Sequence, residues 1–113
     1  MVTAEDVRRL TLSLPRTTEH LIRDRVKFKV RQYVYVTFSH DETLMGFAFP
    51  REERVALVES EPDTFLMPKQ GDLRYNWVVV RLDAIDHDEM TELVTDAWRM
   101  VVPKSVAAEH LGD

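Results

Sequence analysis

The sequence contains no cysteine among its 113 residues. Disulfide bonds, thiolate nucleophiles and sulfur-ligated metal sites are therefore excluded. Only three residues are glycine, and no glycine-rich loop that could cradle a phosphate occurs. No apolar run approaches the ~20 residues of a membrane span, and the polar start MVTAEDVRRL does not resemble a signal peptide. We therefore expect a cytoplasmic protein that does not bind membranes.

The remaining composition is typical of one globular domain. Hydrophobic residues make up 44% of the chain and charged residues 31%, which are ordinary proportions for such a domain. A chain of this length buries about two-thirds of the surface that its unfolded form would expose. No repeat, flexible linker or low-complexity segment is present. We expect a single domain over residues 1–113, as a monomer or a small homo-oligomer.

Positive charge is concentrated in one short part of an acidic chain. The whole sequence has a formal net charge of −5. Residues 16–31 nevertheless hold six cations and two carboxylates, whereas residues 32–113 hold 7 cations and 16 carboxylates. A local asymmetry of this size matters more to a charged partner than the average does.

The basic segment contains a cation at every second position. Alternate residues of a β-strand share one face, so VKFKV at 26–30 predicts a strand with its valines and phenylalanine buried and its lysines exposed. The candidate nucleic-acid-binding residues are Arg23, Arg25, Lys27, Lys29 and Arg31.

Three interpretations of this basic strand are open, one of which is an anionic partner other than nucleic acid. Its cations could contact the phosphates of a nucleic acid, which is where affinity for such partners begins. Tyr33 and Tyr35 could then stack on the bases of a single strand. Alternatively, the cations only keep a strand face hydrated and block pairing at a sheet edge, and the acidic remainder of the chain repels nucleic acid.

Periodicity and capping signals predict the order of the elements. Pairs three residues apart, Thr3 with Asp6 and Asp86 with Glu89, are typical of helix starts. The predicted helices cover 4–14, 51–60 and 86–102, and the predicted strands cover 26–30, 33–38, 44–49, 64–67 and 74–82. Residues 16–20 are interpreted as a polar connection. This order predicts an α+β fold, an antiparallel sheet with helices packed on it.

The last long helix has one apolar stripe. Its residues recur at helical spacing and should be buried against the sheet: Met90, Leu93, Val94, Ala97 and Trp98.

Two identical triplets, His-Asp-Glu at 40–42 and 87–89, could be considered as metal ligands. Consecutive residues rarely converge on one ion, and both triplets fall where turns and helix starts favour polar residues. We therefore predict no metal site and no cofactor.

A second candidate surface is a ligand pocket. Trp77 shares a strand face with Arg81, and an aromatic ring beside an arginine can form a stacking platform. Thr18 and His20 belong to the polar segment RTTEH, which could face the same pocket. Packing of Trp77 in the core, and simple hydrogen bonding of His20, are the alternatives. No nucleophile or oxyanion-hole pattern accompanies these residues, so no catalytic residue is predicted.

Three segments resemble the MmcQ/YjbR-like family of small bacterial proteins. They are LSLPRTTEH (12–20), FKV (28–30) and WVVVRLDAIDHDEMTELVTDAWRMVVPK (77–104). The agreement in order and spacing covers roughly residues 4–107. The resemblance implies an α-β(3)-α-β(2)-α fold, similar to secretion-chaperone-like folds, and favours the short strand at 64–67.

The resemblance also implies a direction for function. Family members are described as carrying a "double wing" DNA-binding motif, one namesake lies among mitomycin-biosynthesis genes, and no shared catalytic apparatus is implied. The chain departs from the family where a hairpin turn often reads Arg-Gly-Lys and here reads Arg31-Gln32. The sequence therefore predicts a non-enzymatic binding module that binds nucleic acid at the basic strand. The alternative is a small-molecule or protein-binding module that takes an anionic or aromatic ligand in a pocket near Trp77 and Arg81.

Overall fold

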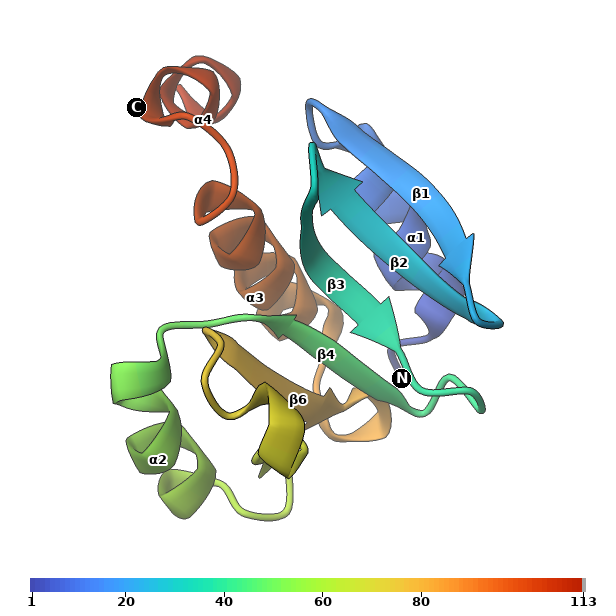
Figure 1. Ribbon diagram of the computed structural model, residues 1–113, viewed down its shortest axis with the longest axis vertical. Helices are drawn as coiled ribbons and strands as arrows, with labels where there is room; N and C mark the ends of the chain where they lie inside the picture. The colour runs from blue at the N-terminus through green and yellow to red at the C-terminus, as the bar shows by residue number, and fades with distance from the viewer. Residues whose placement is uncertain (113) are drawn as a thin grey trace.

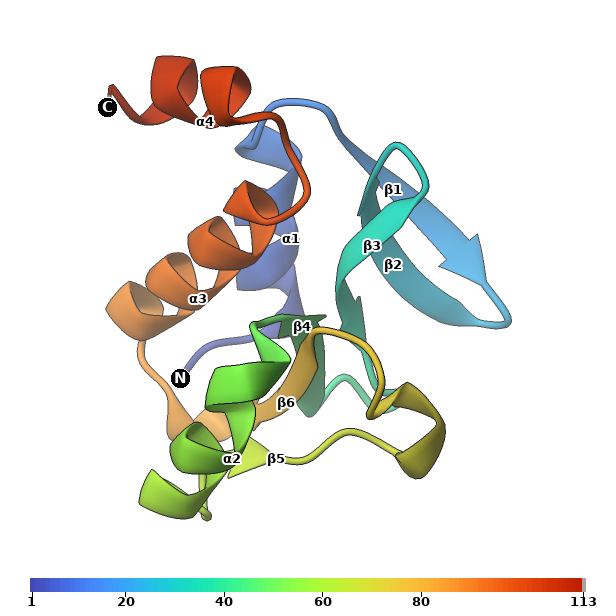
Figure 2. The ribbon, with the colours of Figure 1, turned by 60° about the vertical axis from the view of Figure 1, so that its left-hand side comes forward.

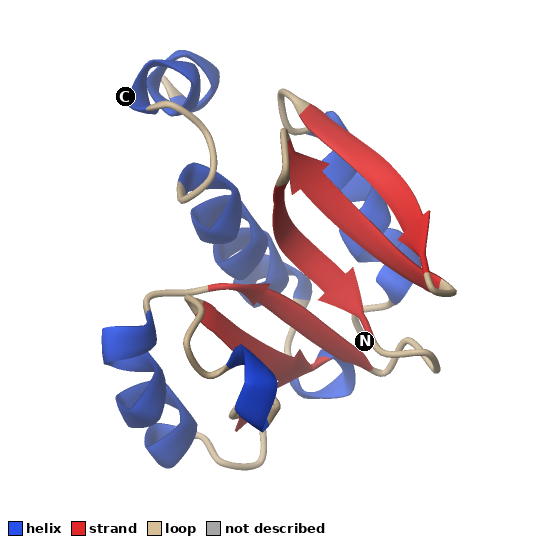
Figure 3. Ribbon diagram, viewed as in Figure 1, coloured by secondary structure: helices blue, strands red, loops and turns tan. Residues whose placement is uncertain are grey.

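The chain folds as a six-stranded antiparallel sheet with helices packed against it (Figures 1 and 3). The computed structural model describes residues 1–112. The helices are α1 (Ala4–Ser13), α2 (Arg51–Ser60), α3 (His87–Arg99) and α4 (Lys104–Leu111), with two short 3₁₀ helices, η1 (Gln70–Asp72) and η2 (Leu82–Ala84). The strands are β1 (Thr17–Ile22), β2 (Arg25–Val30), β3 (Tyr33–Phe38), β4 (Leu44–Ala48), β5 (Phe65–Leu66) and β6 (Trp77–Arg81). Their order in the sheet is β1-β2-β3-β4-β6-β5.

Both predicted helix starts are confirmed. The Thr3 side chain accepts a hydrogen bond from the Asp6 backbone N–H, and the Asp6 carboxylate accepts one from the Thr3 backbone N–H. The hydrogen bonds from Thr3 lower the pKa of Asp6. Asp86 caps α3 by accepting from the backbone N–H of Glu89 at 2.8 Å. No helix within residues 1–112 is long and apolar enough to cross a bilayer.

One face of the sheet forms the core. Helices α1 and α3 contact each other and pack on this face, with α1 near β1 and α3 over β3 and β4 (Figure 2). We call it the inner face. Its buried side chains alternate along the strands: Phe28, Val30, Val36, Phe38, Met45, Phe47, Phe65, Val78 and Val80.

The predicted stripe of α3 supplies the other side of the core. Met90, Val94, Ala97 and Trp98 are buried, and Leu93 is partly buried against them. The Trp98 side chain is 0% exposed. Its indole N–H donates a hydrogen bond to the carbonyl of Pro15 at 2.9 Å, which ties α3 to the end of α1.

The polar segment after α1 is a strand, not the connection that the sequence predicted for residues 16–20. Six residue pairs join β1 to β2 in antiparallel register, from Thr17 opposite Val30 to Ile22 opposite Arg25. The four middle residues of β1 are exposed, so the strand carries no hydrophobic alternation that a sequence pattern could detect. Backbone pairing with β2 maintains this edge strand. The α+β class is confirmed, with four strands rather than three before α2.

Both two-residue turns that flank β2 contain arginine in a left-handed backbone conformation. Arg23 and Asp24 have φ angles of 53° and 64° between β1 and β2, and Arg31 has a φ of 57° between β2 and β3. Such turns normally use glycine or asparagine because a side chain disfavours positive φ. The hairpin predicted on either side of Arg31-Gln32 is confirmed despite this unfavourable turn sequence.

Tyr35 faces the interior because β3 contains an irregularity in register. Phe28 lies opposite Val36 while the next residue, Lys29, lies opposite Val34, so Tyr35 is left without a partner on β2. Its side chain is 0% exposed, and its hydroxyl lies 2.7 Å from Oγ1 of Thr17. The prediction that Tyr35 stacks on bases is therefore wrong, since the bulge turns its ring into the core.

We expect the burial of Tyr35 to make stability fall at high pH. Burial raises the pKa of Tyr35 from 10.0 to about 12, against the opposing effect of the hydrogen bond with Thr17. A pKa that is higher in the folded state gives stability that is complete below pH 10 and is lost as pH rises toward 12. Urea unfolding over this pH range should show a steeper loss for the wild type than for Tyr35→Phe. Equal slopes would contradict this assignment.

Candidate functional site

The face of the sheet opposite α1 and α3, which we call the outer face, carries the predicted basic residues. Arg25, Lys27 and Lys29 alternate along β2 with the buried Phe28 and Val30. All three cations are half-buried. Arg23 and Arg31 are exposed in the turns at the two ends of β2. We call these five cations the basic ridge.

Among residues 1–112, no carboxylate forms an ion pair with a cation of the basic ridge. Within residues 1–112, the ion pairs join Arg8 to Glu5 and Glu19, Arg9 to Asp6, and His87 to Asp6. All of these involve α1 or the start of α3. The one carboxylate of β1, Glu19, is bound to Arg8 at 2.8 Å. The ridge is therefore not neutralised by ion pairs within residues 1–112, and the carboxylate nearest to it in the sequence is the exposed Asp24, between Arg23 and Arg25.

Thr18 and His20 lie beside the basic ridge. In the register of β1 and β2, Thr18 lies opposite Lys29 and His20 lies opposite Lys27. The Thr18 hydroxyl and the His20 Nε2 are 2.9 Å apart. Both residues are exposed, so they extend the polar surface of the ridge to the edge of the sheet.

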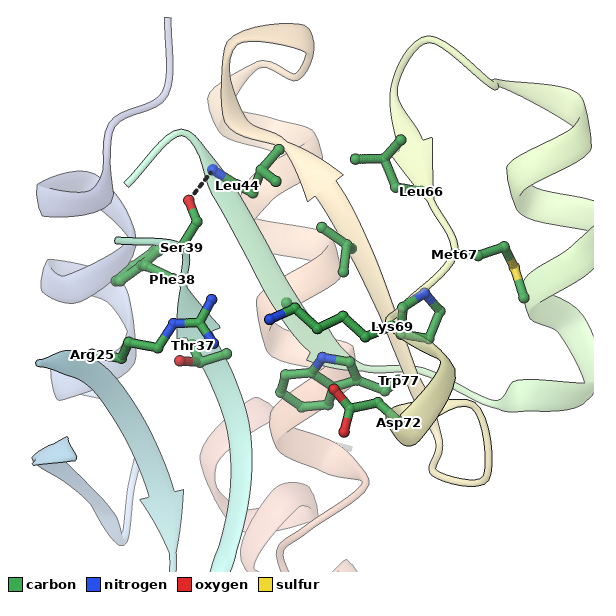
Figure 4. Close-up of a pocket in the computed structure, with 13 residues that line it drawn as sticks. Arg25, Thr37, Phe38, Ser39, Leu44, Leu66, Met67, Lys69, Asp72 and Trp77 are labelled. Carbon is green, nitrogen blue, oxygen red and sulfur yellow. Dashed lines mark hydrogen bonds between the residues drawn. The ribbon is translucent and has the colours of Figure 1, made fainter. Parts of the chain in front are cut away.

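A pocket of about 230 Å³ opens on the same outer face, over β3, β4 and β6 (Figure 4). The strands provide its floor, and the connection between β5 and β6 provides one wall. The lining residues are Arg25, Thr37, Phe38, Ser39, Leu44, Gly46, Leu66, Met67, Pro68, Lys69, Asp72, Trp77 and Val79.

Trp77 forms part of the pocket because Gly46 lets its indole lie against the sheet. A Cβ at position 46 would stand 2.7 Å from the Trp77 Nε1, which no real side chain tolerates. Any larger residue there would push the indole off the strand and change the shape of the pocket.

Two cations reach into the pocket from opposite sides. Arg25 from β2 and Lys69 from the β5–β6 connection point toward each other across it, with Asp72 beside the Trp77 indole (Figure 4). The Nε of Arg25 is buried and has no hydrogen-bond partner within the described residues. An unpaired buried donor costs free energy, and an acceptor on a bound molecule would remove this cost.

The structure regroups the residues predicted for the pocket. Trp77 lines it together with Arg25, which the sequence assigned to the nucleic-acid surface. Thr18 and His20 do not reach it, because three strands separate β1 from β6. Arg81 is exposed at the end of β6 and is not a lining residue.

Sequence reasoning missed the residue that positions the pocket wall, Arg54. This arginine of α2 is only 7% exposed. Its guanidinium donates to the carbonyls of Leu73 at 2.7 Å, Tyr75 at 3.1 Å and Trp77 at 3.0 Å. It therefore anchors the segment that carries Trp77 and leads in from Lys69. Nothing in the polar helix REERVALVES distinguishes this cation from its exposed neighbours.

The two His-Asp-Glu triplets occupy a turn and a helix start, as predicted. Asp41 accepts hydrogen bonds from the hydroxyls of Ser39 and Thr43 and from the Thr43 backbone N–H, and these bonds lower the pKa of its carboxyl. The second triplet opens α3. Within residues 1–112, no three histidine or carboxylate side chains are arranged to hold a metal ion.

Comparisons with known proteins agree on the fold. The model of the YjbR family matches residues 12–100. No curated protein matches the chain. The chain is similar to the crystal structure of Deinococcus radiodurans protein DR2400, whose family-model domain is DUF419, with a TM-score of 0.78 and 22% sequence identity. The match covers 99% of this chain and 89% of that one.

Proposed function

The chain belongs to the YjbR family, and we propose that it is a non-enzymatic module that binds nucleic acid through the outer face of its sheet. The observation that carries this proposal is the basic ridge, whose five cations lie in β2 and its two flanking turns and form no ion pair with a carboxylate of residues 1–112. Phosphate contacts from lysine and arginine supply most of the affinity of non-specific nucleic-acid binding.

The acidic average of the chain does not oppose this proposal at short range. Exposed charges farther apart than about 8 Å are largely screened at physiological ionic strength. A phosphate on the ridge would therefore be influenced mainly by Arg25, Lys27 and Lys29. The resemblance to proteins described as carrying a double-wing motif points in the same direction.

A second candidate function is the binding of a small anionic or aromatic ligand in the pocket alone. The unpaired Arg25 Nε and the opposing Lys69 favour an anion, and the Trp77 indole favours a ring. Titration with a nucleoside monophosphate and with a simple aromatic carboxylate, followed by calorimetry, tests this candidate.

We expect binding to a labelled duplex to weaken steeply with salt. About three or four cations of the ridge can reach one duplex, so the logarithm of affinity should fall with the logarithm of salt concentration with a slope of about −3 to −4. Non-specific dissociation constants should be about 10⁻⁴ to 10⁻⁶ M at physiological salt. The double variant Lys27→Ala with Lys29→Ala should flatten the slope by about two. Fluorescence anisotropy at several salt concentrations measures both quantities.

A charge-matched control distinguishes the loss of ridge cations from a general loss of positive charge. Arg9→Ala with Lys104→Ala also removes two cations, but from α1 and α4 rather than from the outer face. This control should leave the slope unchanged. Absence of binding at low salt would contradict the proposed function, and equal weakening by both double variants would place the contact elsewhere.

A further inference from the structure

We propose that the pocket takes one unstacked base of a single-stranded nucleic acid whose backbone follows the basic ridge. This inference rests on the proposed function and specifies which form of nucleic acid the outer face prefers. Arg25 links the two parts of the surface, because it belongs to the ridge and also lines the pocket. A strand with phosphates on Lys27 and Lys29 therefore reaches the pocket at its next nucleotide position.

The spacing of the ridge supports this path. Alternate residues of a strand are about 6.6–6.8 Å apart, twice the rise per residue. Arg25, Lys27 and Lys29 thus form a row of donors along one line of the sheet. These side chains are long and flexible enough to follow the backbone of a single strand, which bends more easily than a duplex.

The size of the pocket suits one ring system. Sites for drug-sized ligands typically measure about 300–1,000 Å³, whereas this one measures about 230 Å³. Leu66, Met67 and Val79 give it an apolar floor and wall, and Trp77 is only partly buried. Aromatic side chains in such positions are the usual platforms on which single-stranded bases stack.

The polar groups of the pocket match the edge of a base. Lys69 and the Arg25 guanidinium are donors for ring nitrogens and carbonyl oxygens, whereas the Asp72 carboxylate accepts from amino or imino groups. A nucleobase carries both kinds of group on one planar edge. In a duplex this edge is already paired and both ring faces are stacked, so a paired base cannot enter the pocket.

The test compares a fluorescently labelled single strand with a duplex that contains the same sequence, using anisotropy. Loss of one base–aromatic stack typically costs about 5- to 150-fold in affinity. We expect Trp77→Ala to lower single-strand affinity by such a factor and to leave duplex affinity unchanged. Trp77→Phe, which keeps an aromatic face and is the variant more certain to fold, should retain most of the single-strand affinity.

Tyr75→Ala is the matched control, because Tyr75 is an exposed aromatic residue of the same segment that does not line the pocket. It should bind both probes like the wild type. Intrinsic fluorescence provides an independent readout, since Trp98 is buried and Trp77 is the only other tryptophan. A stacked base should quench the wild-type emission, and this quenching should disappear in Trp77→Phe.

The outcomes separate the two proposals. Binding of both probes that is insensitive to Trp77→Ala and does not quench the wild type would overturn the base pocket and leave the basic ridge standing. Binding of neither probe at low salt would overturn both proposals. If a nucleoside monophosphate binds in a Trp77-dependent way while no oligonucleotide binds, the pocket belongs to a free small ligand and both proposals fall.

Discussion

Replacing Trp98 with alanine is expected to lower the free energy of unfolding by about 3–5 kcal/mol. The indole is completely buried in the stripe of α3, and its N–H bonds to the carbonyl of Pro15. The substitution removes a large apolar volume and leaves that carbonyl without its donor. The loss is a large share of the ~5–15 kcal/mol that typically stabilises a whole domain. Urea unfolding monitored by circular dichroism measures it.

Trp98→Phe separates the two contributions of this residue. Phenylalanine keeps an aromatic ring in the core and loses the hydrogen bond, so its cost should be smaller than that of alanine. Leu93→Ala is a control on the same helix, because Leu93 is only partly buried. A loss below about 1 kcal/mol for Trp98→Ala would contradict the packing of α3 on the inner face.

Replacing Arg54 with alanine is expected to lower the free energy of unfolding by about 2–4 kcal/mol. The guanidinium satisfies three backbone carbonyls from a nearly buried position, and hydrogen bonds to charged groups contribute about 1.5–3 kcal/mol where they are removed singly. The loss of unfolding free energy should exceed the contribution of one such hydrogen bond. It should remain below the sum of all three, because water can hydrogen-bond to the carbonyls that Arg54 leaves. Denaturant unfolding measures the loss. Lysine should not rescue it, since a compact ammonium cannot reproduce the planar fork of arginine.

The same variant should also affect the pocket. Arg54 lines no part of it, yet it holds the segment that supplies one wall and ends at Trp77. Single-strand binding by Arg54→Ala should therefore weaken in the direction of Trp77→Ala. Arg51→Ala is the matched control, because Arg51 is an exposed arginine of the same helix whose side chain donates one hydrogen bond, to the carbonyl of Arg74. The loss of unfolding free energy in Arg51→Ala should stay below about 1 kcal/mol. Equal costs at the two positions would contradict the anchoring role of Arg54.

The part of the candidate site that could be predicted from the sequence is the part that depends on the alternation of apolar and charged residues along one strand. Lys27 and Lys29 were assigned to one exposed face because their neighbours Phe28 and Val30 are apolar, and the structure has that arrangement. Tyr35 shows the limit of the same logic. One extra residue in β3 turns the Tyr35 side chain to the inner face. No local sequence pattern predicts this bulge, because it depends on the pairing with β2.

The pocket could be predicted only in fragments. The sequence leaves Trp77 open between a stacking platform and core packing, and nothing in it places Trp77 against Gly46. Their contact follows from the pairing of β4 with β6. Arg25 joins them because β3 alone separates its strand from β4, while Thr18 and His20 lie too far along the sheet.

What the sequence by itself determined is every feature whose cause lies within a few residues. The capped start of α3, its buried stripe and the basic ridge follow from spacings of two to four residues, because side-chain direction repeats with the period of the backbone. Tertiary structure alone decided β1, the inward turn of Tyr35, the burial of Arg54 and the union of Arg25 with Trp77. These features depend on hydrogen bonds and contacts between segments that are distant in the sequence. With different strand pairing, the residues of β1 would form a polar connection, Tyr35 and Arg54 would be exposed, and Arg25 and Trp77 would lie apart.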